Sequence, residues 1–368
     1  MQQETDLYQR AAFQLNICNS CRYCEGYCAV FPALERRTEL GPGSIDLLAN
    51  LCHDCRDCLY ACMYAPPHEF GIDLPRTLSR VRRRSWKDDL PWPARRLAGL
   101  AGAGVAGAVL GFAAVLLVLA GATVGLGQLW QSRSTAASPY DVVSYPAIVA
   151  VTGAAFVYGL AVMALAARRY WQRTGEPGRR TSVRAWRAAL GDAASMRYLR
   201  GGGADCQYPT DTPNPLRRRL HTFLVFGFLA CLLATISAGV MQDIAGDAPP
   251  YPFVSVPVLS GTIGGAALTV GAVGLLLAKR QVDPYATDAE AIGGDAALLV
   301  ALAALALTGL LTLVLRSSAA FGVVLVLHLS AVGACFVLAP SSKFAHVSYR
   351  LLALVRFHLE EQAPVTGS

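Results

Sequence analysis

Charged side chains are scarce in this sequence. Asp, Glu, Lys and Arg make up 15% of its 368 residues, whereas 54% of the residues are hydrophobic. A soluble chain of this length would be expected to form two or three domains. The shortage of charge and the long apolar runs rich in Gly and Ala indicate a membrane protein instead, so the lipid bilayer is the first partner that we expect.

The first 17 residues, MQQETDLYQRAAFQLNI, lack the basic start and apolar centre of a secretory signal peptide. We therefore expect the following segment to stay in the cytoplasm. That segment is rich in cysteine, because eight of the eleven cysteines lie within the first 62 residues. A disulfide framework is typical of small secreted domains. Clustered cysteines in a reducing compartment more often bind metal.

Six apolar runs are close to or longer than the roughly 20 residues that a helix needs to cross a bilayer. Asp141 beside the second run and Asp295 near the start of the fifth are the marginal charges. Backbone groups inside lipid must bond within their own segment, which favours helices. The six expected spans are 97–124, 142–167, 220–241, 253–278, 293–315 and 319–340.

Basic residues indicate how these spans are oriented. The segment 168–219 holds twelve arginines, and a second basic group precedes the first span, whereas the loop 242–252 holds none. Because cytoplasmic loops carry the excess of Lys and Arg, we expect both termini in the cytoplasm, at the inner membrane of a bacterium. Topology explains the positive charge, so we expect no nucleic-acid partner.

Two cysteine runs have the same spacing, CNSCRYCEGYC at 18–28 and CHDCRDCLYAC at 52–62. A C-x2-C-x2-C run wraps three thiolates around one iron–sulfur cubane, and in two-cluster ferredoxins the fourth cysteine of each run binds the other cluster. Zinc sites and redox disulfides are the alternatives, but zinc pairs usually have a longer gap after C-x2-C. We therefore expect one 4Fe–4S cluster on Cys18, Cys21, Cys24 and Cys62, and a second on Cys52, Cys55, Cys58 and Cys28.

Histidines near the membrane indicate a further cofactor. A b-type haem needs two imidazoles from facing helices at one depth. His221 opens the third span and His346 follows the sixth, so both lie at the cytoplasmic face, and we expect them to be the axial ligands. The alternative is that both are polar residues at helix ends. Lys343, Arg350 and the arginines at 217–219 would be near enough to pair with the haem propionates.

The remaining histidines have weaker assignments. His328 is expected in the outer half of the sixth span, about 27 Å from His346 if the segment is one helix, which excludes a shared haem. It could contact a quinone or haem, or only a neighbouring helix. We expect His53, His68 and His358 to be solvated residues. Cys231 and Cys335 are expected to be small residues in packed or lipid-facing helices.

The two cysteine runs, the tail APPHEFGIDLP and the six spans closely resemble the tricarballylate (citrate) utilisation protein B family, over nearly the whole chain. The resemblance implies a protein that reoxidises a separate FAD-dependent tricarballylate dehydrogenase and passes electrons through two 4Fe–4S clusters and haem b to membrane quinone. The spacing from His328 to His346 also resembles the di-haem subunit of respiratory nitrate reductase. That subunit has a second histidine where this chain has Cys231, which implies a single haem here.

The sequence thus predicts a mainly α fold, with a small ferredoxin-like two-cluster cytoplasmic domain at 1–85 and a six-helix transmembrane haem b domain at 86–368 that contains the Arg-rich loop 168–219. We expect an electron-transfer, quinone-reducing subunit. The alternatives are the same module serving a different flavoprotein, as in the related oxidation of the cobalamin ring, or a membrane redox sensor. We expect acidic partners to dock on the Arg-rich loop, at Arg179, Arg180, Arg184 and Arg187.

Overall fold

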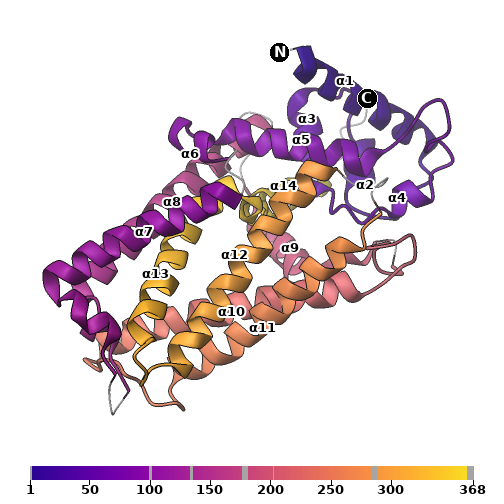
Figure 1. Ribbon diagram of the computed structural model, residues 1–368. Helices are drawn as coiled ribbons and strands as arrows, with labels where there is room; N and C mark the ends of the chain where they lie inside the picture. Colours follow the sequence, from indigo (N-terminus) through magenta and orange to yellow (C-terminus); the bar gives the residue numbers. More distant parts are fainter. Residues whose placement is uncertain are drawn as a thin grey trace.

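The architecture is helical, as the sequence predicts. In the computed structural model the described residues are 2–98, 102–132, 136–175, 181–201, 203–283 and 288–362. Within these ranges the β pairing amounts to an isolated bridge between Gln207 and Pro213. Figure 1 shows a slanted bundle of long helices with a smaller group of helices packed on one end. Helices α1 and α14 both lie at that end, so the two ends of the chain approach the same side of the bundle.

The N-terminal part consists of short helices joined by the cysteine loops. α3 begins with Pro42 directly after Gly41, and a proline in the first turn costs no intrahelical hydrogen bond. α5 begins where the Asp73 carboxylate accepts a hydrogen bond from the backbone nitrogen of Arg76, at 3.2 Å. The helices are α1 (Gln2–Cys21), α2 (Val30–Glu35), α3 (Pro42–Leu51), α4 (Asp57–Tyr60), α5 (Leu74–Asp89) and α6 (Trp92–Leu97).

Six helices are long and apolar enough to cross a membrane, and they match the six predicted runs, so the chain is a multi-pass membrane protein. Most of their large apolar side chains face outward, as expected for helices surrounded by lipid. The six helices are α7 (Gly102–Thr123), α8 (Tyr145–Arg173), α10 (Leu216–Asp243), α11 (Val256–Arg280), α12 (Ala289–Val314) and α13 (Phe321–Leu338).

The chain bends after the sixth span instead of continuing as one helix. α13 ends at Leu338, and two short 3₁₀ turns precede α14 (His346–Glu361). Pro340 lies in the first turn, where a proline cannot continue the α-helical bonding. The Ser342 side chain caps the second turn by accepting a hydrogen bond from the backbone nitrogen of Phe344. The bend directs α14 along the N-terminal helices, where it packs against α3, α8 and α9 (Val183–Ala194).

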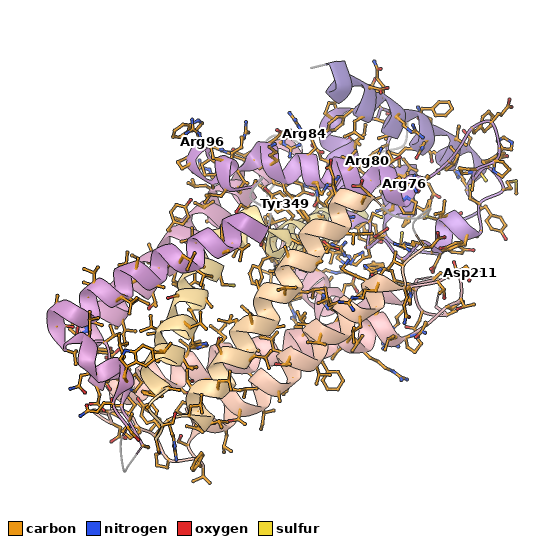
Figure 2. All side chains as sticks on the ribbon, viewed as in Figure 1. Arg76, Arg80, Arg84, Arg96, Asp211 and Tyr349 are labelled. Atoms are coloured by element: carbon orange, nitrogen blue, oxygen red, sulfur yellow. The ribbon has the colours of Figure 1, made fainter. Side chains whose placement is uncertain are left out.

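α5 joins the N-terminal part to the membrane helices. Arg76, Arg80 and Arg84 follow one another along it at intervals of four residues (Figure 2). Arg80 pairs with Asp288 at the start of α12, at 3.4 Å. At the other end of α5, Asp89 pairs with an arginine of α8 at 2.8 Å. The expected domain boundary at 85/86 falls inside this helix, which continues to Asp89.

One hydrophobic core is shared by the N-terminal part and the membrane helices. It contains Leu15 of α1, Leu48 of α3 and Leu78 of α5, together with Tyr170 of α8 and Leu354 of α14. A shared core fixes two parts relative to each other, because separating them would expose buried apolar surface. The cysteine loops are thereby held at a fixed position next to the bundle.

Candidate metal centres

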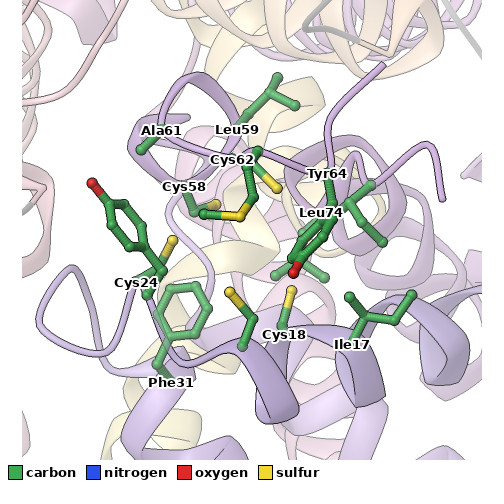
Figure 3. Close-up of a pocket in the computed structure, with 14 residues that line it drawn as sticks. Ile17, Cys18, Cys24, Phe31, Cys58, Leu59, Ala61, Cys62, Tyr64 and Leu74 are labelled. Carbon is green, nitrogen blue, oxygen red and sulfur yellow. The ribbon is translucent and has the colours of Figure 1, made fainter. Parts of the chain in front are cut away.

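Five cysteines line a pocket at the tip of the N-terminal part (Figure 3). Its empty volume is about 490 Å³, part of it open to solvent, and Phe31, Tyr64 and Leu74 form apolar walls. α1 supplies the first two cysteines from its last turn, and α4 and the loop after it supply the last two. The five are Cys18, Cys21, Cys24, Cys58 and Cys62.

The first predicted ligand group is assembled around Cys18. Burial, and after it the like charges of the neighbours Cys62, Cys24 and Cys21, raise the pKa of the Cys18 thiol to about 12. The pKa of the Cys24 thiol is raised as well, first by burial and then by Cys62, and bound iron would supply the positive charge that stabilises the thiolates. Cys62, from the second run, therefore lies with the first three cysteines of the first run.

The second predicted group is more deeply buried. Burial also raises the pKa of the Cys28 thiol to about 12, and the strongest charged neighbour is Cys52. The Cys58 pKa is raised by burial and then by Cys52 and Cys28. Cys52 and Cys55 are 8% and 7% exposed, whereas Cys21 of the first group is exposed. The structure thus brings the two cysteine runs together, and the assignment of the eight cysteines to two crossed ligand groups stays a prediction.

The described part of the chain has no group of three or more His, Cys, Asp or Glu side chains spaced to hold a single metal ion. The cysteines of the first group instead surround the pocket of Figure 3 from several sides. A cubane needs its four thiolates around a volume of this kind, and the residues present fit such a group.

His221 and His346 face each other at the end of the bundle that carries the cysteine loops. Their ring centroids are 6.3 Å apart and the ring planes are inclined by 68°. A metal–nitrogen bond of about 2 Å on each side separates the ring centres of two axial imidazoles by about 6 Å. The pair therefore has the separation required by one iron between the rings.

The bonding of the two rings also fits a metal between them. His346 Nδ1 lies 2.5 Å from the carbonyl oxygen of Lys343, which leaves Nε2 available as a ligand. His221 Nδ1 is buried and has no hydrogen-bond partner among the described residues. A buried ring nitrogen without a partner costs free energy unless another group satisfies it. The residues at this position therefore fit a bis-histidine haem.

The region around His346 is held by a buried ionic group. Asp295 of α12 accepts a hydrogen bond from Lys279 Nζ at 2.7 Å and a second one from Lys343 Nζ. Lys343 is thus bound to α12 through its side chain and to His346 through its backbone oxygen. Phe228, two turns after His221 on α10, packs on Phe344 with centroids 5.3 Å apart. These contacts fix where α14 begins.

His328 lies apart from this pair. Its Nδ1 is 3.1 Å from the hydroxyl oxygen of Thr308, on the neighbouring helix α12. This contact matches the expectation of a hydrogen bond to a neighbouring helix, and a quinone or haem contact stays a prediction. Cys231 and Cys335 are both partly buried and pack against a core formed by buried residues of α11 and α12.

The basic residues expected to pair with haem propionates are engaged elsewhere. Lys343 binds Asp295, and Arg218 binds Asp205 at 2.8 Å. Arg217 and Arg350 both donate to backbone carbonyls of the second cysteine loop. Arg217 and Arg350 therefore bind the N-terminal part of the chain, whereas Lys343 and Arg218 bind acidic residues elsewhere.

Two of the expected solvated histidines have protein partners. His358 is 8% exposed, and its ring nitrogens lie 2.9 Å from carboxylate oxygens of Asp192 and Glu361. His53 is partly buried, with Nδ1 2.8 Å from the carbonyl oxygen of Leu51. Both expectations were wrong, because α9 and the segment around Tyr198 cover surfaces that the sequence alone left open.

Cys206 is a residue that the motif analysis missed. It is 1% exposed, and its thiol donates to the carbonyl oxygen of Leu199 at 3.0 Å. It also hydrogen-bonds Cys55, which is the largest cause of the raised Cys55 pKa. Its position in the Arg-rich segment, remote from both cysteine runs, gave no signal of this contact.

The Arg-rich segment 168–219 covers the second cysteine group with its last part. The backbone nitrogen of Gln207 donates to Asp57 at 3.1 Å, and the guanidinium of Arg56 lies over the Tyr208 ring. Of the arginines expected to dock a partner, Arg184 and Arg187 are exposed on α9, whereas Arg179 and Arg180 lie outside the described residues.

Comparisons with known proteins agree with this arrangement. Residues 97–367 match the family described as citrate utilization protein B, and residues 11–88 match the Fer4-like domain of the same family. The chain is 36% identical to the citrate utilization protein B of Escherichia coli, over 96% of this chain and 93% of that protein. No solved structure matches the chain.

Proposed function

The chain belongs to the citrate utilization protein B family, and from this premise we propose that it is a membrane electron-transfer protein. Its donor would be a separate FAD-dependent dehydrogenase that oxidises tricarballylate, and its acceptor would be membrane quinone. Both termini would lie in the cytoplasm, at the inner membrane of a bacterium. The observation that carries the proposal is the adjacency of the cysteine groups and the histidine pair at one end of the bundle.

The chain's own residues would hold three one-electron cofactors. Two groups of four cysteines would hold two 4Fe–4S clusters, and two histidines would hold haem b. Such cofactors let a two-electron flavin discharge in single steps toward a quinone. The proposed ligands are Cys18, Cys21, Cys24 and Cys62 for the first cluster, Cys52, Cys55, Cys58 and Cys28 for the second, and His221 and His346 for the haem.

The donor would dock at the first cysteine group. Cys21 is exposed, whereas Cys52 and Cys55 of the second group are buried. A shallow groove beside Cys21 is lined by Phe13, Tyr64 and Phe70, and aromatic residues are enriched in protein interfaces. The exposed arginines of α9 would add long-range attraction for an acidic partner.

Anaerobic flavin reoxidation tests the proposal. The dehydrogenase is reduced with tricarballylate, and its flavin absorbance is followed after adding this protein in quinone-containing vesicles. We expect repeated flavin turnover that stops when quinone is left out. A Cys21→Ser variant is the matched control, because it removes one cluster ligand at the exposed side and should abolish turnover.

Two results would overturn the proposal. If the flavin stays reduced with every quinone tested while the clusters are intact, the protein would instead be a redox sensor. If a different flavoprotein, such as one that oxidises a corrin ring, is reoxidised and the tricarballylate dehydrogenase is not, the module serves another donor.

A further inference from the structure

Three arginines from three different helices converge on the backbone of the second cysteine loop. Arg82 of α5 and Arg350 of α14 both donate to the carbonyl oxygen of Cys52, the latter at 2.8 Å. Arg217 of α10 donates to the carbonyl oxygens of His53 and Asp54, at 2.9 and 2.6 Å. Three consecutive backbone oxygens of one loop therefore accept hydrogen bonds from cations. Charge-assisted hydrogen bonds of this kind are among the strongest in proteins.

Two of these arginines lie one helical turn from the histidine pair. Arg217 precedes His221 by four residues on α10, and Arg350 follows His346 by four residues on α14. Residues four apart share one face of a helix. Each helix that presents a histidine thus also presents an arginine to the second cysteine loop, which ties the loop to both sides of the histidine pair.

The positive charge is unevenly divided between the two cysteine groups. Three arginines donate to backbone oxygens of the second loop, whereas in the first run the exposed Arg22 donates to the carbonyl oxygen of Asn19 at 3.2 Å. Asp57 acts on cysteines of both groups, so it does not distinguish them. Asp54 opposes the arginines at the second group, and together with Asp57 it makes two anions against three cations.

Burial acts in the opposite direction. An electron added to a 4Fe–4S group increases its negative charge, and a site removed from water disfavours that charge. The second group is the more buried of the two, so burial alone would make it the harder to reduce. Net charge and solvent exposure both tune cluster potentials. The three arginines supply the compensating charge at the group that needs it.

We propose that Arg82, Arg217 and Arg350 raise the reduction potential of the second cysteine group above that of the first, so that electrons move inward from the exposed group to the group beside the histidine pair. This inference rests on the proposed function. In each step the first group is oxidised by one electron and the second group is reduced by that electron, so the charge balances with no proton or further reactant. The arginines are positioning residues, since they act through the loop and its charge.

An anaerobic redox titration of the purified protein, followed by electron paramagnetic resonance, tests the inference. A Cys62→Ser variant, which lacks a ligand of the first group, identifies the signal of the second. We expect Arg350→Gln and Arg217→Gln each to shift the second signal to lower potential and to leave the first in place. Arg219→Gln is the matched control, because this arginine is an exposed neighbour in the same triplet.

A conservative variant separates charge from geometry. Arg350→Lys keeps the cation, so its potential should lie close to that of the wild type even where the hydrogen bond to Cys52 is lost. If Arg350→Gln fails to retain its clusters, the potential of the second group is compared between Arg217→Gln, which loses a cation, and Arg350→Lys, which keeps one. The inference is wrong if the second signal keeps its potential in the glutamine variants, or if both signals shift equally.

The wild-type titration distinguishes failure of this inference from failure of the proposed function. A wild-type protein without two cluster signals would overturn the proposed function itself. Two signals and a haem spectrum, with potentials that do not respond to the arginines, would overturn only the inference.

Discussion

His221 and His346 lie 125 positions apart in the sequence, yet their ring centroids are 6.3 Å apart in the fold. Two separate structural features, a bend and an ion pair, bring the two rings together. The bend at Pro340 ends α13 and starts α14 at His346, and Asp295 holds Lys343, whose carbonyl oxygen contacts the His346 ring. The pairing thus depends on a turn and an ion pair, in addition to the depth of the two residues in the bilayer.

The first prediction concerns haem binding. His221→Ala and His346→Ala should each abolish the b-type haem signal in the reduced-minus-oxidised optical spectrum, because a single axial histidine remains in each variant. His328→Ala should keep the signal, since this residue contacts Thr308 on α12 instead. Loss of the signal in His328→Ala together with its retention in either of the other variants would contradict the assignment.

The second prediction concerns the crossed cysteines. Cys62→Ser should remove the same paramagnetic signal as Cys21→Ser, and Cys28→Ser should remove the same signal as Cys55→Ser. Each variant should keep about five of nine iron atoms per chain, four in the cluster that has all its ligands and one in the haem. Iron analysis and spectroscopy of the four variants check both statements. If Cys28→Ser instead removed the same signal as Cys21→Ser, each cysteine run would bind its own cluster.

Hydropathy was sufficient to predict the six spans, because the apolar length of a run depends on local sequence. The grouping of the cysteines from their spacing stays a prediction. The six helices follow from apolar length, and the C-x2-C-x2-C runs fix which sulfurs share one loop. The expected depth in the membrane also predicted that His221 and His346 lie near each other, because two helix ends at the same membrane face are confined to a small area.

The long-range contacts could not be predicted from the sequence. His358 contacts Asp192, Cys206 contacts Cys55, and Arg217 contacts the backbone of His53, and each pair is separated by about 150 positions or more in the sequence. The bend before His346 also differs from the continuous helix assumed for the distance to His328. Pro340 is the residue in the sequence that indicates this bend, but a proline near a helix end does not show in which direction the chain turns.

The third prediction concerns the buried ionic group at Asp295. Asp295→Asn leaves Lys279 and Lys343 without their anion, and breaking a buried ion pair by removing one partner costs about 3–5 kcal/mol. We expect about 2–3 kcal/mol here, because the Lys343 side chain is 38% exposed and water screens part of the charge. The thermal unfolding midpoint in detergent should fall by several degrees, and haem content should fall with it, because Lys343 also contacts His346.

Glu290→Gln is the control for this variant. Glu290 lies on the same helix α12 and pairs with Arg83 at 3.1 Å, but its side chain is 86% exposed. An exposed ion pair contributes little to stability, so the midpoint should hardly move. Equal shifts in the two variants would mean that the group around Asp295 contributes no more than a surface pair.

The fourth prediction concerns the packing of α10 on α11. A Cβ at Gly271 would lie 2.5 Å from the backbone nitrogen of Leu224 and 2.8 Å from the carbonyl oxygen of Leu220, on either side of His221. Small residues allow membrane helices to approach this closely. Gly271→Ala should therefore push α10 outward at the level of His221 and cost about 1–3 kcal/mol, as overpacking does.

Gly261→Ala provides the comparison on the same helix. A Cβ there would meet the Cβ of Ala234 at 3.4 Å, an ordinary contact, so the helices need not move. We expect the ratio of haem absorbance to protein to fall in Gly271→Ala and to stay unchanged in Gly261→Ala. If both variants bind haem equally, the approach of α10 to α11 does not set the position of His221, and the bend at Pro340 with the Asp295 group would position the histidine pair from the α14 side alone.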